Sequence, residues 1–191
     1  MPAYRHIRRP GATYFFTVAL ADRSSDLLIR RIADLRSAVA LTMSERPFRC
    51  DAAVILPDHL HMVWTLPTGD ADYSTRWGAI KARFSMSLRR AGFTPPPRLP
   101  QVRSGRYAGV IPGLRHDKGE VAIWQRRFWE HCIRDEADFG AHVAYCWGNP
   151  VKHGLVARAT DWPHSSIHRD RRKGRVPPEW GGEVEGEFGE P

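Results

Sequence analysis

Two histidines separated by a single residue are the first feature of the sequence that could perform chemistry. His59 and His61 lie in the segment PDHLHMVW, where a turn precedes a predicted strand. Side chains alternate between the two faces of a strand, so both imidazoles point the same way, roughly 6–7 Å apart by strand rise. Leu60, Met62 and Trp64 then face the other side, which suits a hydrophobic core. Two imidazoles on one face can share a divalent ion, although two metal-free histidines fit the pattern as well.

A predicted helix nearer the end of the chain offers a complementary pair. The sequence predicts this helix from 135 to about 147, closed by the Asn149-Pro150 pair. Tyr145 and Asn149 are four residues apart and therefore share one flank of the helix. A tyrosine there can reach a site on the face of a sheet, with an amide oxygen one turn away to complete a metal shell. The alternative is a surface tyrosine before an Asn-Pro helix end, and His142 is either a proton acceptor or a packing residue.

The elements that must position these residues alternate in a recognisable order. Strands are predicted at 13–20, 48–56, 59–66 and within 121–133. Helices are predicted from a cap at Asp26 to a stop at Pro47, over 73–91, and from 135 to about 147. The order β-α-β-β-α-β-α indicates an α+β sandwich, with helices on one face of an antiparallel sheet.

One domain over 1–175 accounts for most of the 191 residues. Within it, residues 93–120 are rich in proline, glycine and arginine, which predicts an irregular insertion. Residues 176–191 predict a flexible acidic tail. No run approaches the ~20 apolar residues of a membrane span, and no signal-peptide segment follows the N-terminus. We therefore expect a soluble, cytoplasmic protein without membrane contact.

Charge indicates a polyanionic partner. Lysine and arginine number 29 against 21 acidic residues, a net charge of +8 with a pI near 9.9. Five glutamates fall within 179–191, so 29 basic and 16 acidic residues remain in 1–178, a net +13. Nucleic acid is the first candidate for such a partner, and a solvated basic surface is the alternative. The candidate contacts with a nucleic-acid backbone are Arg76, Lys81, Arg83, Arg89, Arg90, Arg126, Arg127, Arg169, Arg171 and Arg172.

Five ordered segments together resemble a known family. They are YFFTVAL, PDHLHMVW, WQRRFWEHCIRDEADF, HVAYCWGNPVKHGLV and DWPHSSIHRD. In this combination the chain resembles the REP-associated tyrosine transposases, which belong to the single-tyrosine HUH transposases of bacterial insertion sequences. The resemblance runs from about 4 to 180 and leaves out only the 93–120 insertion and the tail.

The resemblance implies a ferredoxin-like α+β sheet and a role for each candidate residue. His59 and His61 would be the histidines of the HUH motif, Asn149 a third metal ligand, and Tyr145 the nucleophile. Family members bind single-stranded REP hairpins and cleave the DNA, leaving a 5′-phosphotyrosine and a free 3′-hydroxyl. Ligands of this mixed nitrogen and oxygen type suit Mg²⁺ or Mn²⁺. No obligate protein partner is implied, and we expect a monomer or a homodimer.

Two alternatives come from other classes of protein. The first is a non-catalytic module of the same fold that only binds DNA or RNA hairpins. The presence of both histidines and the tyrosine favours the enzyme over this module. The second is a structural zinc protein that uses the histidines. It is disfavoured because the sequence offers no further well-spaced cysteine or histidine ligands, and its three cysteines form no CxxC pair.

Overall fold

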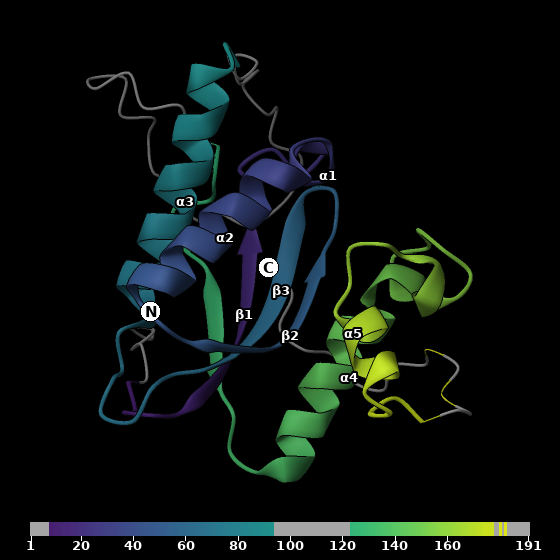
Figure 1. The fold of residues 1–191 in the computed structure, drawn as a ribbon. Coiled ribbons are helices and arrows are strands. Elements are labelled where there is room, and N and C mark those ends of the chain that lie inside the picture. The colour runs from purple at the N-terminus through teal and green to yellow at the C-terminus, as the bar shows by residue number, and fades with distance from the viewer. Residues whose placement is uncertain (1–7, 94–122, 178–179, 181, 183–191) are drawn as a thin grey trace, which may run out of the picture.

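The computed structural model describes residues 8–93, 123–177, 180 and 182. In this part of the chain, four antiparallel strands form a sheet in the order β2-β3-β1-β4 (Figure 1). The strands are β1 (Thr13–Ala19), β2 (Arg49–Ile55), β3 (His59–Thr65) and β4 (Trp129–Cys132). The first three agree with the predicted strands to within one residue at each end, and the fourth is shorter than predicted. The predicted α+β class with an antiparallel sheet is confirmed.

Two long helices cover one face of this sheet. They are α2 (Ile32–Glu45) and α3 (Tyr73–Arg90), with the short helix α1 (Leu27–Arg30) before them. Phe16 and Trp64 from the strands meet Trp77 of α3 in an aromatic core. The rings of Trp64 and Trp77 stack with centroids 4.3 Å apart. The even-numbered residues of β1 and β3 therefore form the apolar face that strand alternation predicted.

The helix α4 (Glu136–Lys152) covers the opposite face, where it packs against Phe15, Val54 and Val63. Figure 1 shows the sheet lying between the α2–α3 pair and α4. The helices therefore cover both faces, whereas the sequence predicted only one. The reason is that β3 is a central strand, buried on both of its faces through its first six residues.

Two helix boundaries also differ from the prediction. The helix expected from Asp26 to Pro47 is broken at Arg31, which separates α1 from α2. Asn149 and Pro150 do not end α4, which continues to Lys152. A proline inside a helix loses one backbone hydrogen bond, and its ring crowds the preceding turn. That cost is confined here to the last turn of the helix.

Packing on the α4 side of the sheet continues beyond α4 itself. A short 3₁₀ helix, η2 (Ala159–Asp161), and the helix α5 (Ile167–Arg172) follow α4. Val176 and Trp180 then pack on the α4 side of the sheet, with the Trp180 ring 5.6 Å from that of Trp147. The insertion from 94 onwards and the rest of the predicted tail lie outside the described residues. Within the described ranges, no helix combines the length and apolarity needed to cross a membrane.

Candidate active site

His59 and His61 lie on the same side of β3, facing α4, as the strand alternation predicted. Their ring centroids are 5.0 Å apart and the rings are nearly perpendicular, at 85°. Both side chains are buried, with exposed fractions of 3% and 0%. The antiparallel pairing of β3 with β1 sets Thr17 opposite His61 and Ala19 opposite His59. The pairing of β3 on both of its edges therefore fixes the backbone that carries both imidazoles.

Each histidine is oriented by a hydrogen bond at its Nδ1 atom. His59 Nδ1 lies 2.8 Å from the Asp58 carboxylate, which in turn forms an ion pair with Arg23 at 2.5 Å. Burial alone would raise the pKa of Asp58, but the hydrogen bonds from His59 and Arg23 outweigh burial and lower that pKa to about 2. His61 Nδ1 lies 2.9 Å from the Thr17 hydroxyl. Because Nδ1 of each ring is engaged, Nε2 is the nitrogen that each histidine would offer to a metal.

Tyr145 approaches these histidines from α4. Its ring centroid lies 5.2 Å from that of His61 and 5.8 Å from that of Phe15, both in edge-to-face contacts. The side chain is fully buried. The Lys152 ammonium donates a hydrogen bond of 3.3 Å to the Tyr145 hydroxyl and lies 4.9 Å from the ring centroid. The structure thus brings together the histidine pair and the tyrosine that the sequence singled out.

Two more residues of α4 follow Tyr145 at one-turn intervals. Asn149 is four residues later and fully buried. His153, the C-cap of α4, is four residues later again, and its ring centroid lies 5.1 Å from that of His59. Sequence reasoning assigned no role to His153 or Lys152. His153 could have been found in the sequence, because it lies four residues after Asn149, as Asn149 lies four residues after Tyr145.

A second cluster of ligand-type side chains joins β4 to α4. His131, Asp138 and His142 bring potential ligand atoms within 4.8 Å of one another, so this cluster could also hold a metal ion. The Asp138 carboxylate accepts hydrogen bonds from His131 Nε2 at 2.8 Å and from the backbone and side chain of Arg134. Burial would raise the pKa of Asp138, but these hydrogen bonds hold the pKa well below its usual range. Residue spacing in the sequence does not reveal this cluster, because His131 lies on β4 whereas Asp138 and His142 lie on α4.

His142 belongs to this cluster rather than to the surroundings of the Tyr145 hydroxyl. Its Nδ1 atom lies 2.8 Å from the backbone oxygen of Asp138, and its ring packs 4.8 Å from that of Phe15. Burial lowers the pKa of His142, which favours the neutral imidazole at pH 7. These contacts match the packing alternative for His142 and not a proton acceptor.

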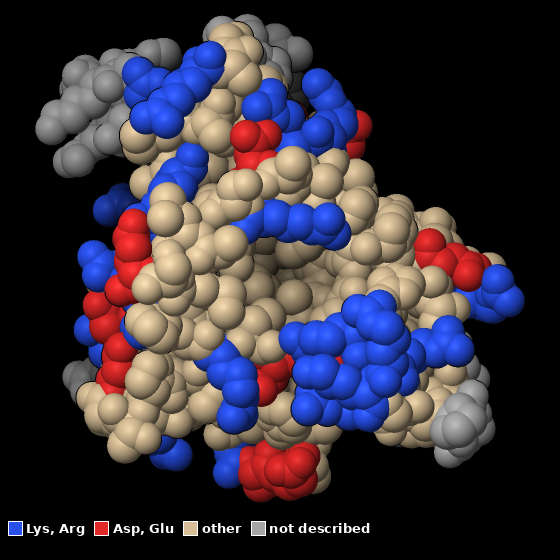
Figure 2. Space-filling model, in the orientation of Figure 1, with Lys and Arg blue, Asp and Glu red and all other residues tan. Residues whose placement is uncertain are grey.

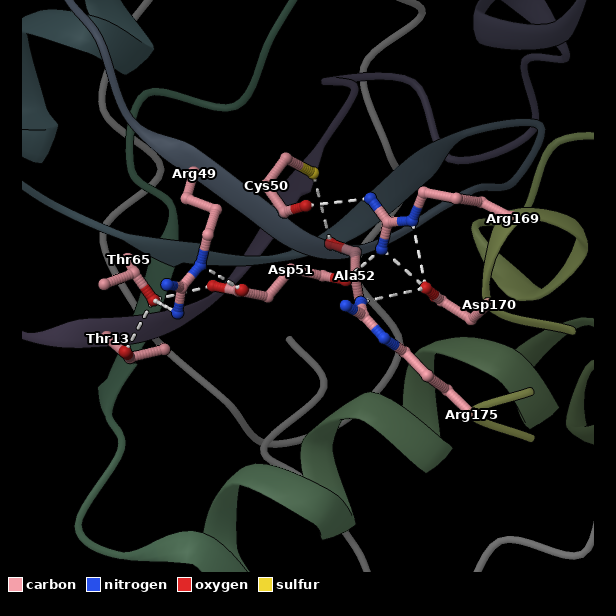
Figure 3. A network of polar contacts seen from close by, with 9 residues as sticks. All are labelled: Thr13, Arg49, Cys50, Asp51, Ala52, Thr65, Arg169, Asp170 and Arg175. Atoms are coloured by element: carbon pink, nitrogen blue, oxygen red, sulfur yellow. Dashed lines mark hydrogen bonds and ion pairs between the residues drawn. The ribbon is translucent and has the colours of Figure 1, made fainter. Parts of the chain in front are cut away.

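Two of the basic residues expected to contact DNA are instead engaged within the fold. Arg76 is 4% exposed, and its guanidinium donates to the backbone oxygens of residues 46, 47 and 72 and to the Asp70 carboxylate. Arg169 donates to the backbone oxygens of Cys50 and Asp51 on β2 and to Asp170 (Figure 3). Both guanidinium groups satisfy backbone carbonyls far away in sequence. No DNA contact is proposed for either arginine.

Replacing Arg76 with alanine should lower the free energy of unfolding by about 3 kcal/mol. The substitution leaves three backbone oxygens and a carboxylate without a buried charged donor. Urea unfolding at pH 7 measures the effect, with Arg171→Ala as the exposed control that should change stability by less than about 0.5 kcal/mol. If Arg76→Ala leaves the stability unchanged but weakens DNA binding, Arg76 contacts DNA and its structural role is contradicted.

The other basic candidates divide into partly engaged and exposed residues. Lys81 donates to the backbone oxygen of Gln125, and burial lowers its pKa to about 8. Arg83 contacts Thr42 and Glu45. The exposed members are Arg89, Arg90, Arg126, Arg127, Arg171 and Arg172. Figure 2 shows lysine and arginine side chains gathered around a hollow on one face of the molecule, with a large group over the α4–α5 side.

Proteins of known sequence and structure resemble this chain over nearly its whole length. It is 40% identical to the REP-associated tyrosine transposase of Escherichia coli (strain K12) over 184 residues, covering 96% of this chain and 93% of that protein. It is also 40% identical to a putative REP-associated tyrosine transposase of Haemophilus influenzae, covering 95% and 94%. A solved REP-associated tyrosine transposase bound to a REP hairpin matches with a TM-score of 0.78 at 39% identity, covering 98% and 95%. No model of a known protein family matches the chain.

Proposed function

Since the chain belongs to the REP-associated tyrosine transposases, we propose that it nicks single-stranded DNA at REP-type hairpins and transfers the strand through a 5′-phosphotyrosine. The REP hairpin bound by the solved relative supports this substrate class. The observation that carries the proposal is the contact between the Tyr145 ring and the His61 ring, at 5.2 Å, beside His59. A nucleophile from α4 and two metal-ligand residues from β3 therefore converge on one side of the sheet.

A divalent metal fits the residues present at this site. His59 is buried, and its Nε2 atom has no hydrogen-bond partner among the described residues. Leaving such a nitrogen buried costs free energy that a metal bond would recover. His61 and Asn149 add a second imidazole and an amide oxygen, a donor set that suits Mn²⁺ or Mg²⁺. We propose that these three residues hold the ion.

The His131–Asp138–His142 cluster is a weaker candidate for this ion. His131 Nε2 already bonds the Asp138 carboxylate, and His142 Nδ1 lies within hydrogen-bond distance of a backbone oxygen. One oxygen of that carboxylate also contacts the backbone and side-chain nitrogens of Arg134. A metal bound at this cluster would have to replace these hydrogen bonds, whereas a metal bound to His59 Nε2 would replace none among the described residues.

The residue types fit transesterification of a phosphodiester. A divalent ion bound at the site would supply Lewis-acid polarisation of a non-bridging phosphate oxygen. The Tyr145 Oη atom forms a bond to phosphorus and its proton passes to water. The bond from phosphorus to the 3′ oxygen breaks, and the departing oxygen takes up a proton from water to give the free 3′-hydroxyl. A phenol, with an ordinary pKa near 10, is a better leaving group than an alkyl alcohol. The strand can therefore be rejoined without ATP.

Exposed arginines are proposed to bind the DNA backbone. Arg89 and Arg90 lie at the end of α3, Arg126 and Arg127 precede β4, and Arg171 and Arg172 lie on α5. Contacts with phosphates supply most of the affinity of such interfaces and position the substrate without reading its sequence. The hollow with surrounding basic side chains in Figure 2 supports this use of the surface.

Hairpin binding should weaken steeply with salt. If the six exposed arginines each neutralise one phosphate, a plot of log affinity against log salt should have a slope between about −4 and −5. Fluorescence anisotropy between 50 and 300 mM NaCl measures this slope, and the paired substitution Arg171→Ala/Arg172→Ala should reduce its size by one to two units. A slope near zero would mean that the basic surface is only solvated.

An assay for a covalent protein–DNA adduct distinguishes the proposed enzyme from a module that only binds hairpins. The protein is incubated with a labelled single-stranded REP-type hairpin and Mn²⁺ and then separated by denaturing electrophoresis. We expect a labelled protein–DNA adduct whose formation stops when EDTA is added. Tight hairpin binding with no adduct under any divalent ion would overturn the catalytic proposal and leave the binding module.

A further inference from the structure

We infer that His153 is a third imidazole ligand of the divalent ion held by His59 and His61. This inference rests on the proposed function and extends it, because it adds a ligand and changes which ions the site prefers. Three observations carry it: the spacing of residues along α4, the distances between imidazole rings, and the buried Nε2 atom of His59.

The first observation is a ladder of residues on one flank of α4. Tyr145, Asn149 and His153 follow one another at intervals of four, and residues four apart lie one above the other on a helix. His153 keeps this alignment as the C-cap, with φ −84° and ψ 4°, and its backbone N–H donates a hydrogen bond of 3.0 Å to the backbone oxygen of Asn149. Side chains on a helix lean towards its N-terminus, which brings His153 back towards Asn149. The nucleophile and both proposed α4 ligands thus occupy one row.

The second observation is the distance between imidazole rings. Metal–nitrogen bonds of about 2.1 Å and ligand angles of about 90° to 109° put the ring centroids of two bound imidazoles about 4.6 to 5.3 Å apart. The separation between His59 and His61 is 5.0 Å, and that between His59 and His153 is 5.1 Å. The imidazole from α4 therefore stands as near to His59 as the second histidine of the HxH pair does.

The third observation concerns His59, whose ring lies beside those of both His61 and His153. Its Nδ1 atom is committed to Asp58 at 2.8 Å, and its Nε2 atom is buried without a hydrogen-bond partner among the described residues. The nitrogen that has to bind the ion therefore belongs to the ring that the other two imidazoles flank. The His59 ring is therefore the one against which both of the other imidazoles pack.

A site with three imidazoles and one amide selects among divalent ions. Imidazole nitrogen favours Mn²⁺, Co²⁺ and Zn²⁺, whereas Mg²⁺ prefers carboxylate, carbonyl and water oxygens. Removal of His153 should therefore reduce affinity most for Co²⁺ and Zn²⁺ and least for Mg²⁺. The nearby Asp58 carboxylate holds His59 at Nδ1 and so orients that ligand.

Cobalt titration of the full chain without DNA tests the inference. Co²⁺ binding is followed by its visible absorption, which reports ligand number and type, and by calorimetry. We expect His153→Ala to weaken Co²⁺ binding by at least about tenfold and to change the absorption band. His153 is exposed, so the substitution should leave the melting temperature of the metal-free protein unchanged. His168→Ala, on α5, is the matched control and should bind Co²⁺ like the wild type.

The outcomes separate this inference from the proposed function. Binding that is lost in His59→Ala and His61→Ala but unchanged, in affinity and spectrum, in His153→Ala would overturn the His153 assignment alone. A wild-type protein that binds no Co²⁺, or binds it equally well without His59 and His61, would overturn the proposed metal site and this inference with it. If His153 only caps the helix, His153→Ala would lower the melting temperature and leave the spectrum unchanged.

Discussion

Replacing His61 with alanine should reduce hairpin cleavage by at least about 10³-fold and leave hairpin affinity within about threefold of the wild type. Metal activation of a phosphodiester contributes several kcal/mol to the transition state, which corresponds to a rate factor of this size. We expect the affinity to depend on the exposed arginines of α3, α5 and the segment before β4, whereas His61 is fully buried. Single-turnover cleavage with Mn²⁺ and fluorescence anisotropy measure the two quantities.

The ring of His61 also packs on Phe15, so His61→Ala could affect folding as well as metal binding. His59→Ala is therefore tested as a second variant of the same metal site. Circular dichroism melting confirms that each variant is folded before its activity is compared. His168→Ala should cleave at the wild-type rate. Parallel loss of binding and cleavage in folded variants would contradict the separation of metal site and DNA-binding surface.

Tyr145→Phe should abolish cleavage and adduct formation with little effect on folding. The substitution removes one oxygen and keeps the ring that packs on His61 and Phe15. The hydrogen bond from Lys152 is lost, at a cost of about 1 kcal/mol in stability. Without the phenol oxygen, no covalent phosphotyrosine can form, and the strand cannot be rejoined. Single-turnover assays and urea unfolding measure the two effects.

Tyr73→Phe is the matched control for the nucleophile. Tyr73 is also fully buried, but it lies in the core on the opposite face and its hydroxyl donates to Glu130 at 3.2 Å. Burial and the Glu130 carboxylate both raise the pKa of Tyr73, which makes its phenol a poorer nucleophile. This variant should cleave like the wild type. Loss of cleavage in Tyr73→Phe, or its survival in Tyr145→Phe, would contradict the assignment.

Local sequence patterns could predict the strands and the orientation of the histidine pair. The alternation around His59 and His61 depends only on the two-residue period of a strand, and Leu60, Met62 and Trp64 do form the opposite core. The helix flank of Tyr145 and Asn149 follows equally from helical periodicity. These features are local, so residue spacing suffices to predict them.

Contacts between distant segments could not be predicted in the same way. Arg76 and Arg169 look like surface cations in sequence, but their partners are backbone oxygens that folding brings to them from other elements. The position of α4 on the second face depends on both sides of β3 being buried. His153 and the His131–Asp138–His142 cluster depend likewise on how α4 docks on the sheet. Tertiary packing, and not local propensity, decides all of these.

The site of the covalent bond tests the central claim most directly. The wild-type protein is trapped on a single-stranded REP-type hairpin with Mn²⁺, the DNA is digested, and the modified peptide is identified by tandem mass spectrometry. We predict a single nucleotide-bearing residue, Tyr145, within the α4 peptide, and no adduct in the Tyr145→Phe protein. An adduct on any other tyrosine, or efficient cleavage with no adduct at all, would contradict the proposal that Tyr145 is the nucleophile.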